Sequence, residues 1–328
     1  MTATAGEPTP PVLAEVIRSG FTESRHRGSV LALGADGTPV LRAGQVSQPM
    51  FPRSANKPLQ AAALLRAGLD LDGKLLALAA ASHSGEDFHV AGVREILARA
   101  GLTESALRCP PALPLDETVQ RELLRRGGGP DRVHMNCSGK HAAMLACCVA
   151  NGWPTGDYLD PGHPVQAAIR GTLAELAGQQ IEHVGVDGCG APLFALSLTG
   201  VARALRGLVT APAGSPQRRV ADAMRAYPDW TSGSRRPERA LMTAVPGLLV
   251  KSGAEGVEGL ALADGRAAAY KIEDGASRAR PALTVAVLRR LGVASEPGVD
   301  GTALDQIAHV PVLGGEQEVG VVRATLPA

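Results

Sequence analysis

Aromatic residues are scarce in this sequence. Phe, Trp and Tyr together make up 3% of its 328 residues, although 45% are hydrophobic. We therefore expect a core filled mostly by Ala, Leu and Val, in which helices approach one another closely. An excess of either charge is also missing, because 33 Lys and Arg residues face 32 Asp and Glu residues. Without a basic field the chain is not expected to bind nucleic acid, so we expect a small-molecule substrate.

The sequence also lacks segments that direct a chain to or through a membrane. Residues 1–11 have neither the basic start nor the apolar centre of a signal peptide. No run of about 18 apolar residues predicts a membrane span. The five cysteines are odd in number and two are adjacent, which is not typical of a disulfide framework. We therefore expect a cytoplasmic protein with reduced thiols and no membrane partner.

Strand patterns occur at both ends of the chain and helix patterns in its centre. Short apolar segments bounded by turns predict strands, and apolar residues with a period of about 3.6 predict helices. The predicted strands are 12–17, 29–33, 39–43, 247–250, 259–263, 267–272 and 318–324, and the predicted helices are 89–100, 164–176, one from 215, 237–244 and 277–291. We expect an α+β fold with a mixed, mostly antiparallel sheet built from the two ends and flanked by helices.

This organisation predicts one catalytic unit behind a disordered tail. Residues 1–11 would form the tail and residues 12–328 the unit. Residues 12–53 and 245–328 would form a sheet lobe, and residues 54–244 an inserted helical lobe. No linker is long enough to separate independent domains.

Three short polar strings, far apart in the sequence, carry the predicted chemistry. They have the form and order of the S-x-x-K, serine-triplet and K-[ST]-G strings of penicillin-recognising serine enzymes. They are Ser54-Ala55-Asn56-Lys57, Ser82-His83-Ser84 and Lys251-Ser252-Gly253. A serine hydroxyl is a weak nucleophile and needs an adjacent base. A lysine can be this base when burial or a second cation lowers its pKa, so the strings predict an amide hydrolase.

The first string contains the predicted nucleophile and its base. On a helix, Ser54 and Lys57 are three residues apart and share a face. Pro58 is tolerated only in a first turn, so the helix must begin near Ser54, where free N–H groups can stabilise developing negative charge. The proline also predicts a distorted first turn. Each string alone is more often a helix start, a capping cluster or a strand end, but their order favours catalysis.

Seven strings resemble the asparaginase II family of the Rhizobium etli inducible type, in the family's order and across nearly the whole chain. They are Glu23-Ser24-x-His26-x-Gly28, Arg53-Ser54-Ala55-Asn56-Lys57-Pro58, Ala81-Ser82-His83-Ser84-Gly85-Glu86-Asp87-x-His89, Asn136-Cys137-Ser138-Gly139-Lys140-His141, Asp187-Gly188-Cys189, Lys251-x-Gly253-Ala254-Glu255-Gly256 and Lys271-Ile272-Glu273-Asp274-Gly275. The resemblance implies a serine β-lactamase/penicillin-binding-protein-like fold and hydrolysis of L-asparagine to L-aspartate and ammonia. It also implies a cytoplasmic homodimer.

The resemblance further implies roles for individual residues. Ser54 would be the nucleophile, with Lys57 beside it. Ser82 and Lys251 would form a second serine–lysine pair that relays protons. In the wider fold two backbone amides bind the oxyanion, and here these would belong to Ser54 and Ala254.

Three more polar residues are candidates for substrate binding. The Arg53 guanidinium suits an α-carboxylate, and a salt bridge to Glu86 or Asp87 is the alternative. Asp187 would hold the α-amino group of the substrate, unless it only forms an Asp-Gly turn. Asn136 is a further candidate for a substrate contact.

Members of the family carry two cysteines near the active site, which match Cys137 and Cys189, with Lys140 close by. Two thiolates suit zinc, although a closed structural site has four ligands. The resemblance therefore implies a zinc ion at these three residues, and buried free cysteines are the alternative. The serine–lysine chemistry is complete without a cofactor, so a metal would be an adjunct.

Two other functions stay open at this point. One is another serine acyl-transfer enzyme on the same fold, such as a glutaminase, a β-lactamase or a peptidase. A periplasmic β-lactamase would need an export signal. The other is an amino-acid-binding protein without catalysis, against which the intact serine–lysine set argues.

Overall fold

The computed structural model describes residues 9–327, so residues 1–8 of the predicted tail lie outside it. The strands are β1 Val12–Arg18, β2 Phe21–Leu33, β3 Pro39–Ala43, β4 Pro49–Met50, β5 Val184–Val186, β6 Pro192–Phe194, β7 Leu196–Ser197, β8 Leu248–Ser252, β9 Val257–Leu262, β10 Ala267–Ile272, β11 Val310–Gly314 and β12 Gln317–Ala324. The helices are η1 Arg53–Asn56, α1 Lys57–Arg66, α2 Gly73–Ala79, α3 Asp87–Arg99, η2 Glu104–Ala106, α4 Glu117–Arg125, α5 Ser138–Ala150, α6 Pro164–Ala177, α7 Leu198–Thr210, α8 Pro216–Ala226, α9 Pro228–Thr231, α10 Pro237–Ala244, α11 Arg280–Arg290, η3 Val293–Ser295 and α12 Gly301–Ala308. Within residues 9–327, no helix has both the length and the apolar character needed to cross a membrane.

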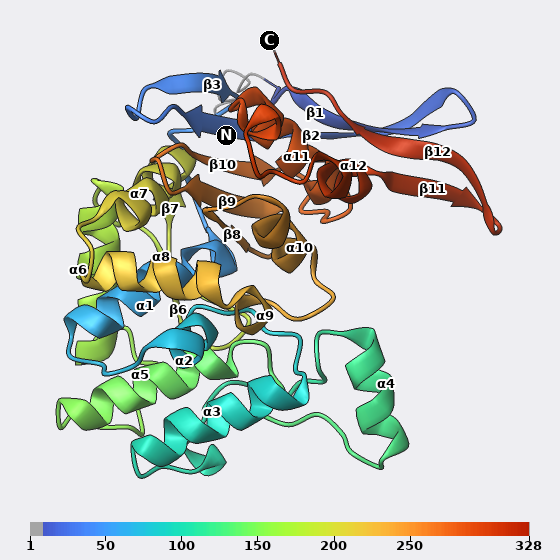
Figure 1. Ribbon diagram of the computed structural model, residues 1–328. Helices are drawn as coiled ribbons and strands as arrows, with labels where there is room; N and C mark the ends of the chain where they lie inside the picture. The colour runs from blue at the N-terminus through green and yellow to red at the C-terminus, as the bar shows by residue number, and fades with distance from the viewer. Residues whose placement is uncertain (1–8, 328) are drawn as a thin grey trace, which may run out of the picture.

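The large sheet joins the two ends of the chain (Figure 1). Its strand order is β11-β12-β1-β2-β10-β9-β8, and β3 pairs with β2. Every pairing between these strands is antiparallel. The predicted α+β fold, with a mostly antiparallel sheet built from both ends and flanked by helices, is therefore confirmed. The division into one unit of two lobes stays a prediction.

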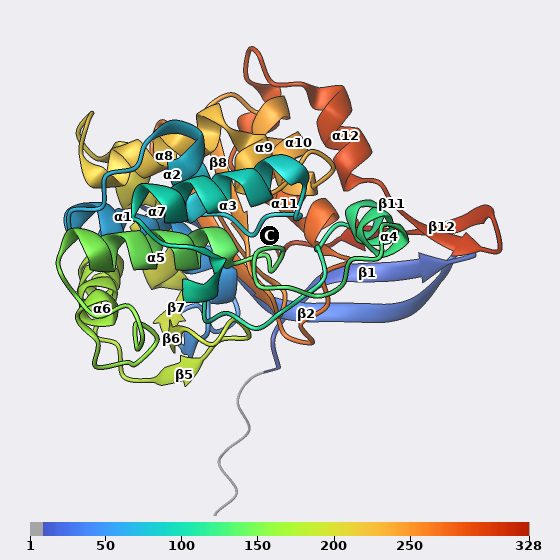
Figure 2. The ribbon, with the colours of Figure 1, turned by 90° about the horizontal axis from the view of Figure 1, so that it is seen from below.

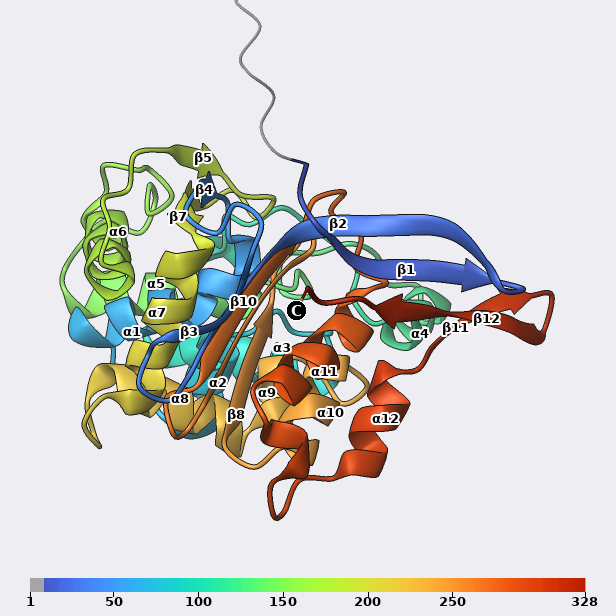
Figure 3. The same ribbon diagram turned by 90° about the horizontal axis from the view of Figure 1, so that it is seen from above.

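Alternate residues of the central strands face two separate cores. Leu31 of β2 and Ala269 of β10 belong to the core that contains α1, α5, α6, α7 and α8. Val30 and Tyr270, their neighbours in sequence, belong to the core formed with α10, α11 and α12. This follows from the pleat, because successive side chains of a strand point to opposite faces. The sheet thus lies between two layers of helices, with α7 packed on β2, β9 and β10 (Figure 3).

Small residues bring these layers close together. The buried hydrophobic residues are largely Ala, Leu and Val, as the low aromatic content predicted. Gly259 of β9 packs on α7, where an added Cβ would lie 2.5 Å from Cδ1 of Leu205. Gly139 of α5 lies equally close to α2, since its Cβ would be 2.5 Å from the carbonyl oxygen of Leu78.

Two long hairpins, β1–β2 and β11–β12, extend beyond the helices (Figure 2). The predicted strand 29–33 is only the second half of β2, which begins at Phe21. The first half pairs with β1 from Phe21 to Arg27. Its sequence, FTESRHR, is mostly polar, so it lacks the apolar alternation by which a strand is recognised. This half of β2 is a strand because it pairs with β1, and its own sequence pattern does not reveal it.

Because β2 and β10 approach each other closely, we predict that two glycine substitutions change the free energy of unfolding very differently. In Gly28→Ala the new Cβ would lie 2.1 Å from the carbonyl oxygen of Lys271, so we expect a loss of about 1–3 kcal/mol in the free energy of unfolding. Gly171→Ala is the matched control, because its Cβ would meet no atom within 4 Å on an exposed face of α6. It should gain up to about 1 kcal/mol. Urea denaturation of both variants measures this, and equal stabilities would contradict the packing described.

Candidate active site

The predicted nucleophile lies in a strained turn at the start of α1. Residues Arg53–Asn56 form the 3₁₀ helix η1, and α1 follows with Pro58 in its first turn. The entry to the helix is thus distorted, as predicted, although Lys57 itself has α-helical angles (φ −58°, ψ −36°). Arg53 has a φ of +51°, which is left-handed and unfavourable for a residue with a Cβ. Ser54 comes directly after this strained residue.

The Ser82 hydroxyl joins the two lysines of the predicted site. Its Oγ accepts one hydrogen bond from Nζ of Lys57, at 3.0 Å, and one from Nζ of Lys251, at 2.9 Å. Lys57 also donates to the carbonyl of Ala81, at 2.6 Å, and Lys251 to the carbonyl of Ser252, at 2.7 Å. All three polar side chains are buried. The fold therefore brings together groups that are 25 and 169 residues apart in the sequence.

Burial makes one of these lysines easy to deprotonate. It lowers the pKa of Lys251 to about 7, and the nearby charge of Lys57 acts in the same direction. The Glu238 carboxylate opposes this by raising the pKa of Lys251. A lysine with a pKa near 7 can act as a base at neutral pH.

Ser54 and Ser82 line the same cleft, which has a volume of about 360 Å³. Asn136 and Ala254, two of the predicted substrate-binding residues, also line it. The Ser54 hydroxyl forms no hydrogen bond with any residue in the described part of the chain. Its proton and lone pairs are therefore available to a substrate in the cleft.

Two backbone N–H groups at this cleft are also available. Among residues 9–327, no acceptor takes a hydrogen bond from the N–H of Ser54 or of Ala254. The two segments lie against each other at Gly253, where an added Cβ would be 2.6 Å from the carbonyl oxygen of Pro52 and 3.2 Å from the amide nitrogen of Ala55. Free donors this close to a nucleophile are what an oxyanion hole requires.

Arg53 and Asp187, the other two predicted substrate-binding residues, contact each other. Nε of Arg53 donates to Oδ1 of Asp187 at 2.8 Å, and its Nη1 lies 3.8 Å from Oε1 of Glu255. The alternative prediction, a salt bridge from Arg53 to Glu86 or Asp87, is wrong. Glu86 instead accepts hydrogen bonds from the hydroxyls of Ser84, in the same loop, and Ser234, in another loop. Neither Arg53 nor Asp187 is among the residues that line the cleft, and their ion pair holds the strained turn in place.

Cys137, Cys189 and Lys140 lie together beside Asn136. Nζ of Lys140 donates to Sγ of Cys189 at 3.1 Å, and Sγ of Cys137 lies 3.0 Å from Oδ1 of Asn136. A hydrogen bond from Cys137 and the charge of Lys140 lower the pKa of Cys189, against the effect of burial. The Cys189 charge in turn raises the pKa of Lys140, although burial acts to lower it. Lys140 thus favours the ionised form of Cys189, and Cys189 favours the charged form of Lys140.

These residues do not fit the predicted zinc ion. Among residues 9–327, no group of three or more His, Cys, Asp or Glu side chains is placed to hold a metal. Cys137 and Cys189 supply two sulfurs, which is fewer than the four ligands of a closed zinc site. The zinc prediction is therefore not supported, and all five cysteines are free and buried.

Sequence reasoning missed a charged group behind the Lys251 strand. Arg236 and Arg280 line the cleft, and Glu238 and Glu258 are buried next to them. The one available signal was Glu258, a carboxylate in the otherwise apolar segment Val-Glu-Gly-Leu-Ala-Leu. A buried carboxylate needs a partner, but nothing local indicates which residue supplies it.

Known proteins were compared with this chain at the level of family, sequence and fold. The sequence pattern of the family described as L-asparaginase II matches residues 14–324. No curated protein gives a significant match. Three solved structures are distantly similar. A protein from Bacteroides dorei DSM 17855, provisionally named a β-lactamase, has 14% identity and a TM-score of 0.48 over 81% of this chain and 93% of its own.

The other two structures are similar to the same degree. A β-lactamase from Mycobacterium bovis has 16% identity and a TM-score of 0.42 over 87% of this chain and 97% of its own. EstCE1, a hydrolase with promiscuous acyltransferase activity, has 12% identity and a TM-score of 0.45 over 80% of this chain and 93% of its own. These values are too low to carry an assignment, which rests on the family match over nearly the whole sequence. The chain belongs to the L-asparaginase II family.

Proposed function

We propose that this chain is an L-asparagine amidohydrolase that forms an acyl-enzyme on Ser54. Membership of the L-asparaginase II family supports the substrate. The mechanism rests on one observation, the Ser82 hydroxyl held between Lys57 and Lys251 beside the cleft that Ser54 lines. A cytoplasmic homodimer is also proposed, from the family resemblance alone.

In the proposed mechanism a proton passes between the amines of Lys57 and Lys251 through the Ser82 hydroxyl, which contacts both. When this proton is on Lys251, Lys57 is neutral and has two N–H groups and one lone pair. Both N–H groups are used, by the carbonyl of Ala81 and by the Ser82 hydroxyl. The lone pair is left for the Ser54 hydroxyl. Ser54 lies on the 3₁₀ turn that leads directly into Lys57, and side chains three residues apart on such a turn lie on the same side.

The proton transfers that accompany attack and release all take place among Ser54, Ser82 and the two lysines. The Ser54 oxygen bonds to the side-chain amide carbon of asparagine as Lys57 takes its proton. The C–N bond breaks, and ammonia leaves with a proton delivered through Ser82. Water attacks the aspartyl ester and gives a proton to the same pair of amines. The amines return a proton to the Ser54 oxygen as its bond to the acyl carbon breaks, and L-aspartate leaves.

The remaining predicted residues would stabilise or orient the reacting group, from the cleft or from behind it. The free N–H groups of Ser54 and Ala254 would bind the oxygen that becomes negatively charged on attack. Asn136 would contact the substrate amide. Arg53 and Asp187 would act as positioning residues, since their ion pair fixes the turn that carries Ser54.

Substrate comparison tests the proposed function directly. Purified protein should release ammonia from L-asparagine faster than from L-glutamine, and should leave a chromogenic cephalosporin intact. Faster turnover of glutamine or of the cephalosporin would favour another acyl-transfer enzyme of this fold. Calorimetric binding of asparagine without ammonia release would establish a binding protein.

Removal of the nucleophile or of its base should abolish turnover. For Ser54→Ala and Lys57→Met we expect kcat to fall at least about 1,000-fold, because both groups act in the same bond-forming step. Lys74→Met is the matched control, since Lys74 lies on the surface over Trp230 and outside the cleft. If Ser54→Ala retains more than a few per cent of the activity, Ser54 is not the nucleophile.

The pKa of Lys251 predicts the pH dependence. Below about pH 7 the Lys251 amine becomes protonated, and the pair of amines then has no lone pair left for Ser54. We therefore expect kcat/KM to rise with pH and to level off above a midpoint near pH 7. Burial also raises the pKa of Glu258 to about 7, so Glu258→Gln is the control. If this variant abolishes the acid limb, the limb belongs to Glu258 and not to the lysine pair.

A further inference from the structure

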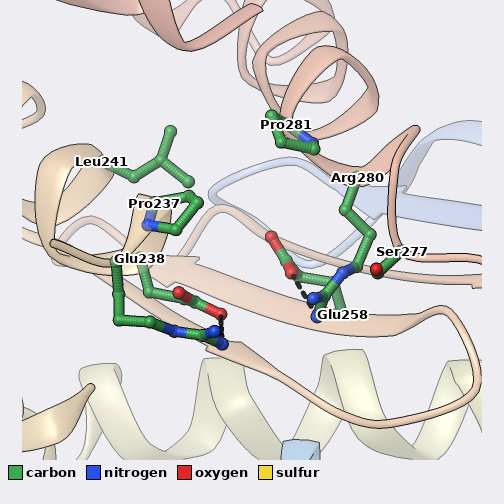
Figure 4. A pocket seen from close by; sticks show the side chains of 8 residues that line it. Pro237, Glu238, Leu241, Glu258, Ser277, Arg280 and Pro281 are labelled. Atoms are coloured by element: carbon green, nitrogen blue, oxygen red, sulfur yellow. Dashed lines mark hydrogen bonds and ion pairs between the residues drawn. The ribbon is translucent and has the colours of Figure 1, made fainter. Parts of the chain in front are cut away.

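A second cavity lies next to the catalytic cleft, behind the strand that carries Lys251. It has a volume of about 170 Å³ and lies between α10, β9 and the start of α11 (Figure 4). Arg236, Ser277 and Arg280 line both this cavity and the cleft that contains Ser54. The two hollows therefore share these three residues as a common wall.

Each of the two arginines is paired with a buried glutamate. Nη2 of Arg236 lies 3.3 Å from Oε1 of Glu238, and Nη1 of Arg280 lies 3.7 Å from Oε2 of Glu258. The glutamate side chains are 6% and 5% exposed, whereas the arginine side chains are 24% and 18% exposed. The carboxylates are thus the inner members of both pairs and the guanidinium groups the outer ones. Figure 4 shows Glu238 and Glu258 on opposite sides of the cavity.

Further hydrogen bonds fix the two glutamates. Ser252, the neighbour of Lys251, donates its hydroxyl proton to Glu238. Thr284 of α11 donates to Oε1 of Glu258 at 2.6 Å. Because both carboxylates are held in this way, the guanidinium groups that pair with them have little freedom to move.

The guanidinium groups have donors to spare. Nε of Arg236 and Nε of Arg280 are buried without a hydrogen-bond partner in the described part of the chain. Nη1 of Arg236 and Nη2 of Arg280 likewise have no acceptor among residues 9–327. A buried donor without an acceptor is costly, and a bound carboxylate would remove this cost because it accepts several N–H groups at once. Unpaired donors on two arginines that line the same cleft therefore indicate a site for an anionic group.

We propose that Arg236 and Arg280 bind the α-carboxylate of the substrate. The proposal rests on the proposed function and assigns the carboxylate to different residues from those that the sequence indicated. Arg53 is already paired with Asp187 and Glu255 and does not line the cleft. Arg236 and Arg280, in contrast, line the cleft that Ser54 and Ser82 share. A carboxylate held there orients the other end of the same small molecule toward the catalytic serine.

The test compares two substrates that differ only in this carboxylate. 3-Aminopropanamide is L-asparagine without its α-carboxylate and keeps the amide and the amino group. For Arg236→Met and Arg280→Met we expect kcat/KM for L-asparagine to fall about tenfold to hundredfold, mainly through KM. The kcat/KM for 3-aminopropanamide should stay within about twofold of wild type. Arg239→Met is the matched control, because Arg239 lies on α10 three residues after Arg236, pairs with Asp229 on the surface and lines neither hollow.

Calorimetry gives a second readout that does not need turnover. In a Ser54→Ala background, either arginine substitution should weaken binding of L-asparagine by about tenfold or more. Equal losses of kcat/KM for both substrates would indicate a structural role and overturn the proposal, as would an unchanged affinity. A wild-type protein that binds asparagine but releases no ammonia would instead reject the proposed function, and the calorimetric comparison would still decide the role of the arginines.

Discussion

The site depends on one hydroxyl oxygen that two buried lysines share. Ser82 Oγ lies within 3.0 Å of both amines. Two ammonium groups so close together in a buried site repel each other strongly, since little water screens them. Loss of one proton relieves this repulsion, which is why burial and the charge of Lys57 lower the pKa of Lys251 to about 7. The repulsion that favours loss of one proton from the pair therefore also creates a base at neutral pH.

The fold holds this arrangement by joining three segments that are distant in the sequence. The sheet carries Lys251 on β8, the helical layer carries Lys57 at the start of α1, and Ser82 lies in the loop after α2. Strain is concentrated where the first two segments meet. Arg53 and Glu255 both have positive φ values, +51° and +58°, and their side chains lie 3.8 Å apart. Contacts across the two loops therefore stabilise backbone conformations that neither loop would adopt alone.

Local patterns predicted much of the fold, and tertiary contacts decided the rest. The strands 39–43 and 267–272 and the helix 237–244 match the structure residue for residue, because their turns and apolar residues mark their ends. α7 was missed, since Gly200 and Gly207 lower its helix propensity, yet it packs on three strands of the sheet, β2, β9 and β10. At the site, the serine and lysine residues share short motifs and could be found from spacing. Arg236 and Arg280 belong to no motif, and only the fold places them at the cleft.

The protonation state of Lys251 can be observed directly by NMR. The sequence contains five lysines, at positions 57, 74, 140, 251 and 271, so the ¹³Cε signals of labelled lysine can be assigned by single substitutions. The account predicts that one lysine titrates with a midpoint near pH 7 and that its signal is absent in Lys251→Met. If Lys251 instead titrates near the ordinary lysine value of about 10.4, the two amines do not share a proton through Ser82 and the proposed base does not exist.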